Sequence, residues 1–238
     1  MIIKYLKYRL KPLQFLALAM FMALFCLNVF LTYSSAVLNF IFLFLGFIVF
    51  RFIDDAGSVT IDRIAHPDRT YLTKENYPSF LKIVVIVTIL LLTYTTFFLP
   101  NSLIVISGFI AISICLYLIF NSNKSIMIFI PLLKYPTLLW CISGLTLVPN
   151  RILAILGSFF IMYLYDQLDQ QEKPKSDLMI LVTCIVCGLL IFQPWLNLYL
   201  IGLVILPVSL IIKYSHLKIM KPLVIIYYSL GNLIVLYL

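Results

Sequence analysis

The chain has 238 residues, of which 63% are hydrophobic and 11% are charged, and its mean hydropathy is +1.12. This composition excludes a soluble globular domain and predicts a polytopic membrane protein. The net charge of +8 suits loops that stay cytoplasmic and contact anionic membrane lipids, so it requires no nucleic-acid partner.

Nine apolar runs are long enough to cross the roughly 30 Å hydrocarbon core of a bilayer. Because no remaining stretch is long enough for a soluble domain, residues 1–238 are predicted to form a single all-α membrane domain, one helical bundle around a cytoplasm-facing cavity. Pro131 and Pro136 interrupt the fifth run, which leaves open a helix that begins only after Pro136, with 121–135 lying at the interface. The predicted spans lie near 13–33, 36–53, 79–99, 102–120, 127–148, 151–168, 178–194, 196–213 and 222–238.

The basic residues predict the orientation of these spans. Short loops rich in lysine and arginine stay on the cytoplasmic side of a membrane. Nine spans threaded from a cytoplasmic N-terminus place all of the 17 Lys and Arg residues except Arg151 on that side. We therefore expect an integral membrane protein with its N-terminus in the cytoplasm, in the inner membrane of a bacterial cell.

The carboxylates lie in two windows, one after the second span and one after the sixth, and both windows open on the predicted cytoplasmic side. In the first window, a helix that continues from the second span places Asp54, Ser58 and Asp62 at positions i, i+4 and i+8. Asp55 lies seven residues before Asp62, so these side chains share roughly one face, and that face can hold a divalent cation. His66-Pro67 is expected to stop the helix.

The second window repeats this arrangement of acids. Asp166, Asp169 and Glu172 follow three residues apart on one helical face, with Tyr163 and Tyr165 just before them. We expect the two acidic helix ends to face each other across the cavity.

The first window also resembles a known motif. An apolar helix that runs into Asp54 and Asp62, followed by His-Pro-x-Arg ending at Arg69, is similar to the first aspartate motif of the UbiA-type intramembrane prenyltransferases. Ser58 stands where that motif has a middle aspartate. In the second window, Tyr-x-x-Asp ending at Asp166 resembles the start of the second motif, and Asp169 lies one position before its second aspartate.

This resemblance implies a membrane prenyltransferase, which moves a prenyl group from a prenyl diphosphate to an unidentified acceptor reached from the lipid. A diphosphate needs cations to stabilise it as a leaving group, and Mg²⁺ prefers oxygen ligands. The implied catalytic residues are Asp54, Asp62 and Asp166, and the implied metal ligands are Asp54, Asp55, Asp62, Asp166 and Asp169. The implied substrate-binding residues are Asp55, Ser58, Arg63, Arg69, Lys134, Tyr163, Tyr165 and Asp169.

Other functions stay open at this point. A catalytically degenerate lipid-binding or transport protein on the same fold fits the serine at position 58 and the offset of Asp169. A CDP-alcohol phosphotransferase needs an Asp-Gly followed by Ala-Arg, which the residues from Asp54 to Val59 do not supply. An ion channel or proton-coupled carrier usually has ionisable residues in the middle of its spans, and these spans are almost free of them.

Overall fold

A computed structural model describes the helical core of the first part of the chain. The described residues are 5, 18–19, 22, 33–65, 69, 71, 73–120, 123–127, 129–143, 152, 155–156, 159–160 and 162–163. The chain divides into two compact units, Met1–Ala23 with Leu31–Leu145, and Leu24–Phe30 with Thr146–Leu238. In the second unit the described residues are helical, and the rings of Phe159 and Phe160 meet edge to face.

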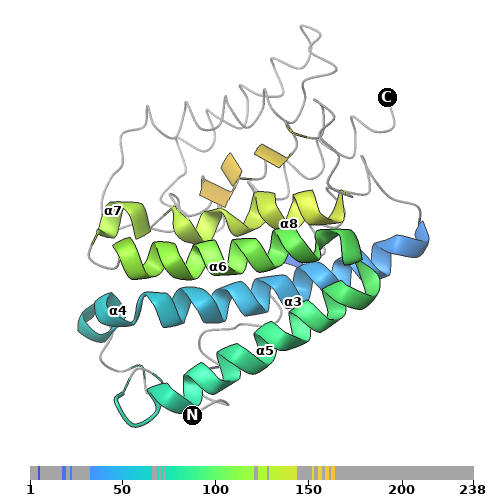
Figure 1. The fold of residues 1–238 in the computed structure, drawn as a ribbon. Coiled ribbons are helices and arrows are strands. Elements are labelled where there is room, and N and C mark those ends of the chain that lie inside the picture. Colours follow the sequence, from blue (N-terminus) through green and yellow to red (C-terminus); the bar gives the residue numbers. More distant parts are fainter. Residues whose placement is uncertain are drawn as a thin grey trace, which may run out of the picture. The chain divides into compact units, whose positions relative to one another are not determined.

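The first unit is built from helices joined by short turns (Figure 1). Within the described residues, three helical segments are long and apolar enough to cross a membrane, and they confirm the second, third and fourth predicted spans. The protein is therefore an integral membrane protein by the length and composition of these helices. The elements are α3 (Tyr33–Gly57), α4 (Val59–Ala65), α5 (Tyr77–Phe98), η3 (Pro100–Ser102), α6 (Leu103–Phe120), α7 (Lys124–Met127), η4 (Ile130–Leu132) and α8 (Lys134–Ile142).

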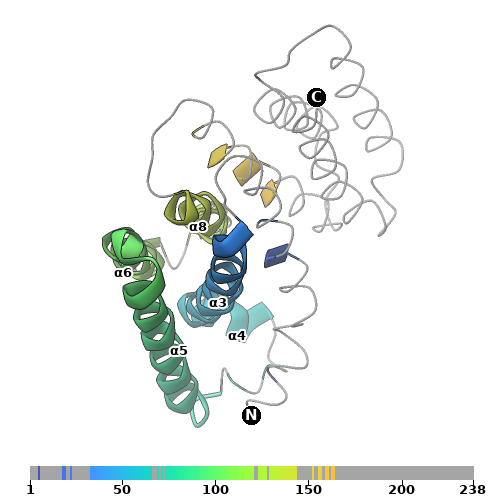
Figure 2. The same ribbon diagram turned by 90° about the vertical axis from the view of Figure 1, so that its right-hand side faces the viewer.

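Helix α3 is the inner helix of this unit. It packs against α5, α6 and α8 (Figures 1 and 2). Of its membrane-spanning window, 56% is buried, against 17% for α5 and 22% for α6. The outer faces of α5 and α6 carry exposed aliphatic side chains such as Ile86, Leu90 and Ile112, which suits contact with lipid. The charged end of α3 is thus enclosed by protein.

The helix that carries the first acidic window is almost continuous. Ser58 forms a turn between α3 and α4, but its N–H still donates to the Asp54 carbonyl at 2.9 Å. The N–H of Asp62 donates in turn to the Ser58 carbonyl at 2.9 Å, so the helical hydrogen-bond pattern runs through the turn. Helix α4 ends at Ala65, directly before the His66-Pro67 pair that was predicted to stop it.

The fifth predicted span differs from the structure. Within 124–143 the described residues form three short elements, α7, η4 and α8, instead of one continuous helix. Pro131 lies inside η4, and Pro136 is the third residue of α8, a first-turn position where its missing N–H costs no helical hydrogen bond. Helix α8 therefore begins at Lys134, two residues before Pro136, and not after it.

An aromatic cluster holds Tyr5 against α3 and α5. Tyr5 is buried among Phe52, Tyr71 and Phe80. Its ring stacks on Phe52 with centroids 4.8 Å apart and meets Tyr71 edge to face at 4.9 Å. Such ring pairs add to the free energy gained by burying apolar area, so Tyr5 is held firmly beside the last turns of α3.

Two glycines let neighbouring helices approach α3 closely. A Cβ atom built on Gly57 would lie 2.3 Å from Cγ of Tyr117 in α6, and one built on Gly46 would lie 2.7 Å from a methyl group of Leu138 in α8. The contact at Gly57 involves the base of an aromatic ring, which cannot move without shifting the helix. In α6 itself, a Cβ on Gly108 would meet nothing within 4 Å.

We predict that Gly57→Ala destabilises the protein by about 1–3 kcal/mol, because the added methyl group overpacks the contact with Tyr117. The matched control Gly108→Ala should be neutral or slightly stabilising, since alanine is the better helix former by about 1 kcal/mol. Thermal unfolding of the purified variants in detergent measures both effects. Equal melting temperatures for the two variants would contradict the close approach of α3 and α6.

Candidate functional site at the end of helix α3

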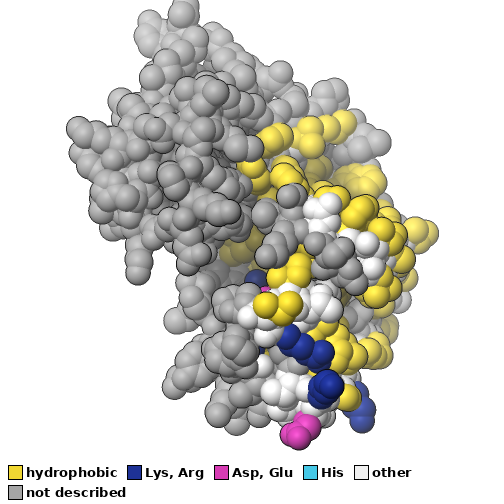
Figure 3. Space-filling model, turned by 90° about the vertical axis from the view of Figure 1, so that its left-hand side faces the viewer, with side chains coloured by type: hydrophobic (Ala, Val, Ile, Leu, Met, Phe, Trp, Pro, Cys, Tyr) yellow, Lys and Arg dark blue, Asp and Glu magenta, His cyan; other side chains and the backbone are white. Residues whose placement is uncertain are grey.

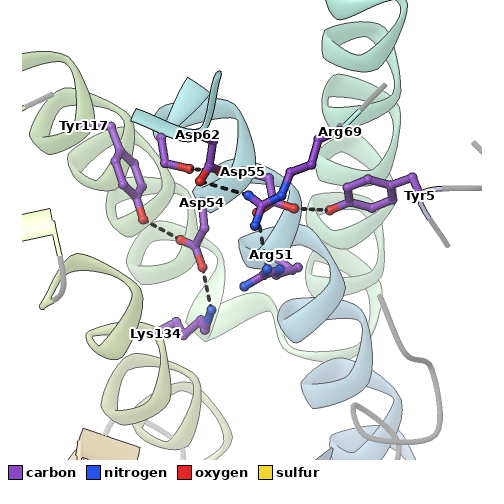
Figure 4. Close-up of polar contacts among 9 residues, drawn as sticks. Tyr5, Arg51, Asp54, Asp55, Asp62, Arg69, Tyr117 and Lys134 are labelled. Atoms are coloured by element: carbon purple, nitrogen blue, oxygen red, sulfur yellow. Dashed lines mark hydrogen bonds and ion pairs between the residues drawn. The ribbon is translucent and has the colours of Figure 1, made fainter. Parts of the chain in front are cut away.

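Charged side chains of the first unit gather at one end of its helices. Figure 3 shows basic and acidic side chains at the end where α4 and the start of α5 lie, beside a hydrophobic surface. The exposed members of this group are Arg63, Lys74, Glu75 and Lys82. Beneath them, Asp54, Asp55 and Asp62 project from α3 and α4 (Figure 4).

Asp54 is buried between α3, α6 and α8, and two donors from distant segments share its carboxylate. The Tyr117 hydroxyl donates to Oδ1 at 2.7 Å, and the Lys134 ammonium donates to Oδ2 at 2.6 Å. Asp54 is 8% exposed and Lys134 is 5% exposed, so water competes little for this ion pair. A buried carboxylate of this kind is stable only because its charge is matched.

Asp55 has its own pair of donors on another side of α3. The Tyr5 hydroxyl donates to Oδ2 at 2.9 Å, and the Arg51 guanidinium lies 3.4 Å from Oδ1, one helical turn earlier. Burial, together with the negative charge of Asp55, raises the pKa of the Tyr5 phenol above its ordinary value. Tyr5 therefore stays protonated and keeps donating to Asp55.

Asp62 repeats the same arrangement closer to the surface. The Ser58 hydroxyl donates to Oδ2 at 2.8 Å, and Nη1 of Arg69 lies 2.9 Å from Oδ1. The serine that replaces the middle aspartate of the resembled motif is therefore a hydrogen-bond donor to the outer aspartate. Each of the three aspartates thus has one hydroxyl donor and one basic partner.

The geometry separates the aspartates more than the sequence suggested. Consecutive residues on a helix point about 100° apart, and Asp54 contacts α6 and α8 while Asp55 contacts Tyr5 (Figure 4). Carboxylate oxygens are the ligands that Mg²⁺ prefers. Among the described residues, however, no three His, Cys, Asp or Glu side chains are grouped to hold a metal ion. As arranged here, the first-motif aspartates do not fit a shared Mg²⁺ site.

The structure brings several predicted site residues together. Lys134 and Arg69, expected to bind phosphate, each contact an aspartate. Arg63 is exposed, and its guanidinium lies over the Tyr77 ring, 5.4 Å from the centroid. Tyr163 is a buried residue of the second unit. The remaining predicted residues of the second window, Tyr165, Asp166 and Asp169, lie outside the described residues.

Three partners of the aspartates were not predicted as site residues. Tyr117 is the polar side chain near the end of an apolar span, and a hydroxyl at that depth usually needs a hydrogen-bond partner. A tyrosine at this place in the sequence therefore indicates a buried hydrogen-bond partner, although Tyr117 was not among the predicted site residues. Arg51 lies one turn before Asp55, which is a standard spacing for an ion pair on a helix. For Tyr5, no local pattern indicates a contact 50 residues away.

Two buried side-chain nitrogen atoms of the site lack a hydrogen bond. Nε of Arg51 and Nη1 of Arg69 have no hydrogen-bond acceptor in the part of the chain that the structure describes. Nη1 of Arg69 is close enough to Asp62 for an ion pair, but the alignment is not that of a hydrogen bond. Buried donors are nearly always satisfied, so these two N–H groups are the atoms of the described site whose hydrogen bonding is incomplete.

No protein-family model, curated protein or solved structure matches the chain. The relationship to the UbiA-type prenyltransferases, expected from the first aspartate motif, therefore stays a prediction.

We predict that Asp54→Asn and Lys134→Gln each lower the free energy of unfolding by about 3–5 kcal/mol, because each leaves an uncompensated buried charge. The double variant should lose much less than the sum of the two, since it removes both charges together. Chemical denaturation of the detergent-solubilised protein measures this coupling. Additive losses would show that the two side chains do not form a buried pair.

Proposed function

We propose that the protein is a membrane-embedded prenyltransferase, which moves a prenyl group from a prenyl diphosphate to an acceptor reached from the lipid. The diphosphate binds at the charged end of α3. The observation that carries this proposal is the pair of arginines, Arg51 and Arg69, beside the three motif aspartates: within the described residues, Nε of Arg51 makes no hydrogen bond, and Nη1 of Arg69 makes only its ion pair with Asp62. Guanidinium groups bind phosphate oxygens through strong, charge-assisted hydrogen bonds.

The apolar surroundings of α3 support the step that follows loss of the diphosphate. Loss of diphosphate leaves an allylic cation on the prenyl group, and water would consume that cation. A prenyl tail that extends from the charged end along the apolar helices would be shielded from water. Tyr163 and Tyr165 stay candidates for stabilising the cation through their ring faces. The acceptor stays open among a quinone precursor, a tetrapyrrole, a sugar phosphate and a peptide.

The charges of the site limit how a diphosphate can bind. The ion pairs join three aspartates to three basic residues, so the described cluster is electrically neutral. A diphosphate adds about three negative charges and needs further cations. Exposed Arg63 and Lys74 lie at the same end of the unit. Mg²⁺ stays a predicted cofactor, with Asp166 and Asp169 as its predicted ligands; when bound, it would neutralise the departing diphosphate.

The proposed orientation places this end of the helices in the cytoplasm. The turn between α4 and α5 carries basic residues, among them Lys74, and α7 begins at Lys124 after the short turn that follows α6. Basic residues in short loops favour the cytoplasmic side. An N-terminus in the cytoplasm and a location in the inner membrane of a bacterial cell are parts of the same proposal.

A specific observation favours a second candidate, a non-catalytic protein that binds or carries a prenyl lipid. Each described aspartate is already matched by a basic residue and a hydroxyl group. A site of this kind can bind the polar head group of a prenyl lipid without breaking the bond between the prenyl group and the diphosphate. The two candidates share the lipid and differ in whether the bond to the diphosphate breaks.

We predict that Arg51→Gln and Arg69→Gln each weaken binding of geranylgeranyl diphosphate by about tenfold or more, because a hydrogen bond to a charged group contributes about 1.5–3 kcal/mol. The matched control is Lys82→Gln, an exposed charge at the same end, which should change binding by at most about twofold. Retention of radiolabelled donor by the purified protein measures these effects.

The same samples separate the two candidates. Pyrophosphate released in the presence of Mg²⁺ and a panel of acceptors identifies a transferase. Retained donor with no release for any acceptor favours the lipid-binding protein. If the wild type retains no donor, both candidates fail, and equal losses for Arg69→Gln and Lys82→Gln would reject the proposed site.

A further inference from the structure

Each oxygen of the Asp54 carboxylate already has a protein donor in the observed arrangement. Tyr117 occupies Oδ1 and Lys134 occupies Oδ2. The Lys134 nitrogen lies 2.6 Å from Oδ2, close to the place where a cation bound to that oxygen would lie, since Mg²⁺ sits about 2.0–2.1 Å from its ligands. A divalent ion bound to Oδ2 at this place would have to displace a buried ammonium group.

The fold holds Lys134 in this position. Lys134 and Leu138 lie one turn apart on α8, and Leu138 packs directly on Gly46 of α3. Asp54 lies eight residues further along α3, about 12 Å from Gly46 along the helix axis. One turn of α8 covers about 6 Å of that length, and the extended lysine side chain covers the rest. The small residue at position 46 thus sets the reach of Lys134.

The side chain of Lys134 has further support from its surroundings. Its ammonium lies 5.6 Å from the centroid of the Tyr135 ring, and that ring packs against Phe47 of α3. Both the lysine and the aspartate are more than nine-tenths buried. A long, buried side chain with a fixed path and two charged or aromatic partners is not a mobile surface charge.

We propose that Lys134 is the built-in counter-ion of Asp54 and takes the place of a divalent cation there. Asp54, the leading aspartate of the first motif, then stabilises the packing of the end of α3 against α6 and α8 and does not coordinate metal. The counter-ion role stands on the contacts of Asp54 alone. Its consequence for donor binding rests on the proposed function: any dependence of donor binding on Mg²⁺ arises at residues other than Asp54.

Manganese binding tests this role, with Mn²⁺ followed by electron paramagnetic resonance on the full chain in detergent. The wild type and the double variant Asp54→Asn/Lys134→Gln should bind Mn²⁺ equally, because any ion held elsewhere is common to both. Lys134→Gln alone should bind it about tenfold or more tightly than the wild type, since the buried carboxylate is left without its cation. If this single variant does not fold, comparing Mn²⁺ binding by the wild type and by the double variant still tests the proposal.

Binding of Mn²⁺ that is about tenfold tighter in the wild type than in the double variant would overturn the proposal, because it would place the ion on Asp54. Donor retention supplies the second readout. The ratio of geranylgeranyl diphosphate retained with Mg²⁺ to that retained in EDTA should be the same in the two proteins, and a ratio that falls only in the double variant would also overturn it. If the protein retains no donor in any buffer, the proposed function is rejected. Mn²⁺ binding then remains the test of the counter-ion role of Lys134.

Discussion

The ion pair between Asp54 and Lys134 is the contact on which the rest of this site depends. It joins residues 80 positions apart, on the inner membrane helix and on the short helix that packs against it. A carboxylate this deeply buried cannot stay charged without a close cation. The pair, with the Tyr117 hydroxyl on the second oxygen, allows an apolar span to carry an acid inside its last turn. The neighbouring pairs follow the same rule, buried at Asp55 and closer to the surface at Asp62.

Packing and charge are coupled at this end of α3. Gly57 lets the ring of Tyr117 lie against the helix, and Gly46 lets α8 approach through Leu138. A larger residue at Gly57 would move the hydroxyl donor of Asp54, and a larger residue at Gly46 would move the helix that carries its lysine partner. The site is therefore specified by small residues as well as by charged ones, because distances of a few tenths of an ångström decide whether a buried donor reaches its acceptor. Nε of Arg51 and Nη1 of Arg69 are the atoms of this network that make no hydrogen bond within the described residues, and the proposed donor binds there.

Much of the first unit could be predicted from the sequence, because length and hydropathy determine a membrane span with little help from tertiary contacts. The third span was expected at 79–99 and is found as α5, Tyr77–Phe98. The second was expected to leave the apolar region at residue 53, but the apolar window extends to Gly57. Hydropathy counts Asp54 and Asp55 as charges, whereas the fold neutralises both. The fifth span was expected near 127–148 with Pro131 and Pro136 interrupting it, and within 124–143 the described residues form the short elements α7, η4 and α8.

The sequence predicted which acids belong to the site but not which basic and hydroxyl groups pair with each of them. Motif spacing identifies residues that are near in sequence, such as Ser58 and Asp62, and their contact is observed. Tyr5, Tyr117 and Lys134 donate to Asp54 or Asp55 from 50 to 80 residues away, and only tertiary packing brings them together. For that reason, a carboxylate face expected to bind metal is found occupied by lysine, arginine and hydroxyl groups.

The most direct test of this account is an experimental structure of the full chain in lipid nanodiscs, determined with Mg²⁺ and geranylgeranyl diphosphate present. The account predicts that the Lys134 ammonium stays within hydrogen-bonding distance of Asp54, while phosphate oxygens accept from Arg51 and Arg69. A metal ion bound between Asp54 and Asp62, with Lys134 turned away, would contradict it.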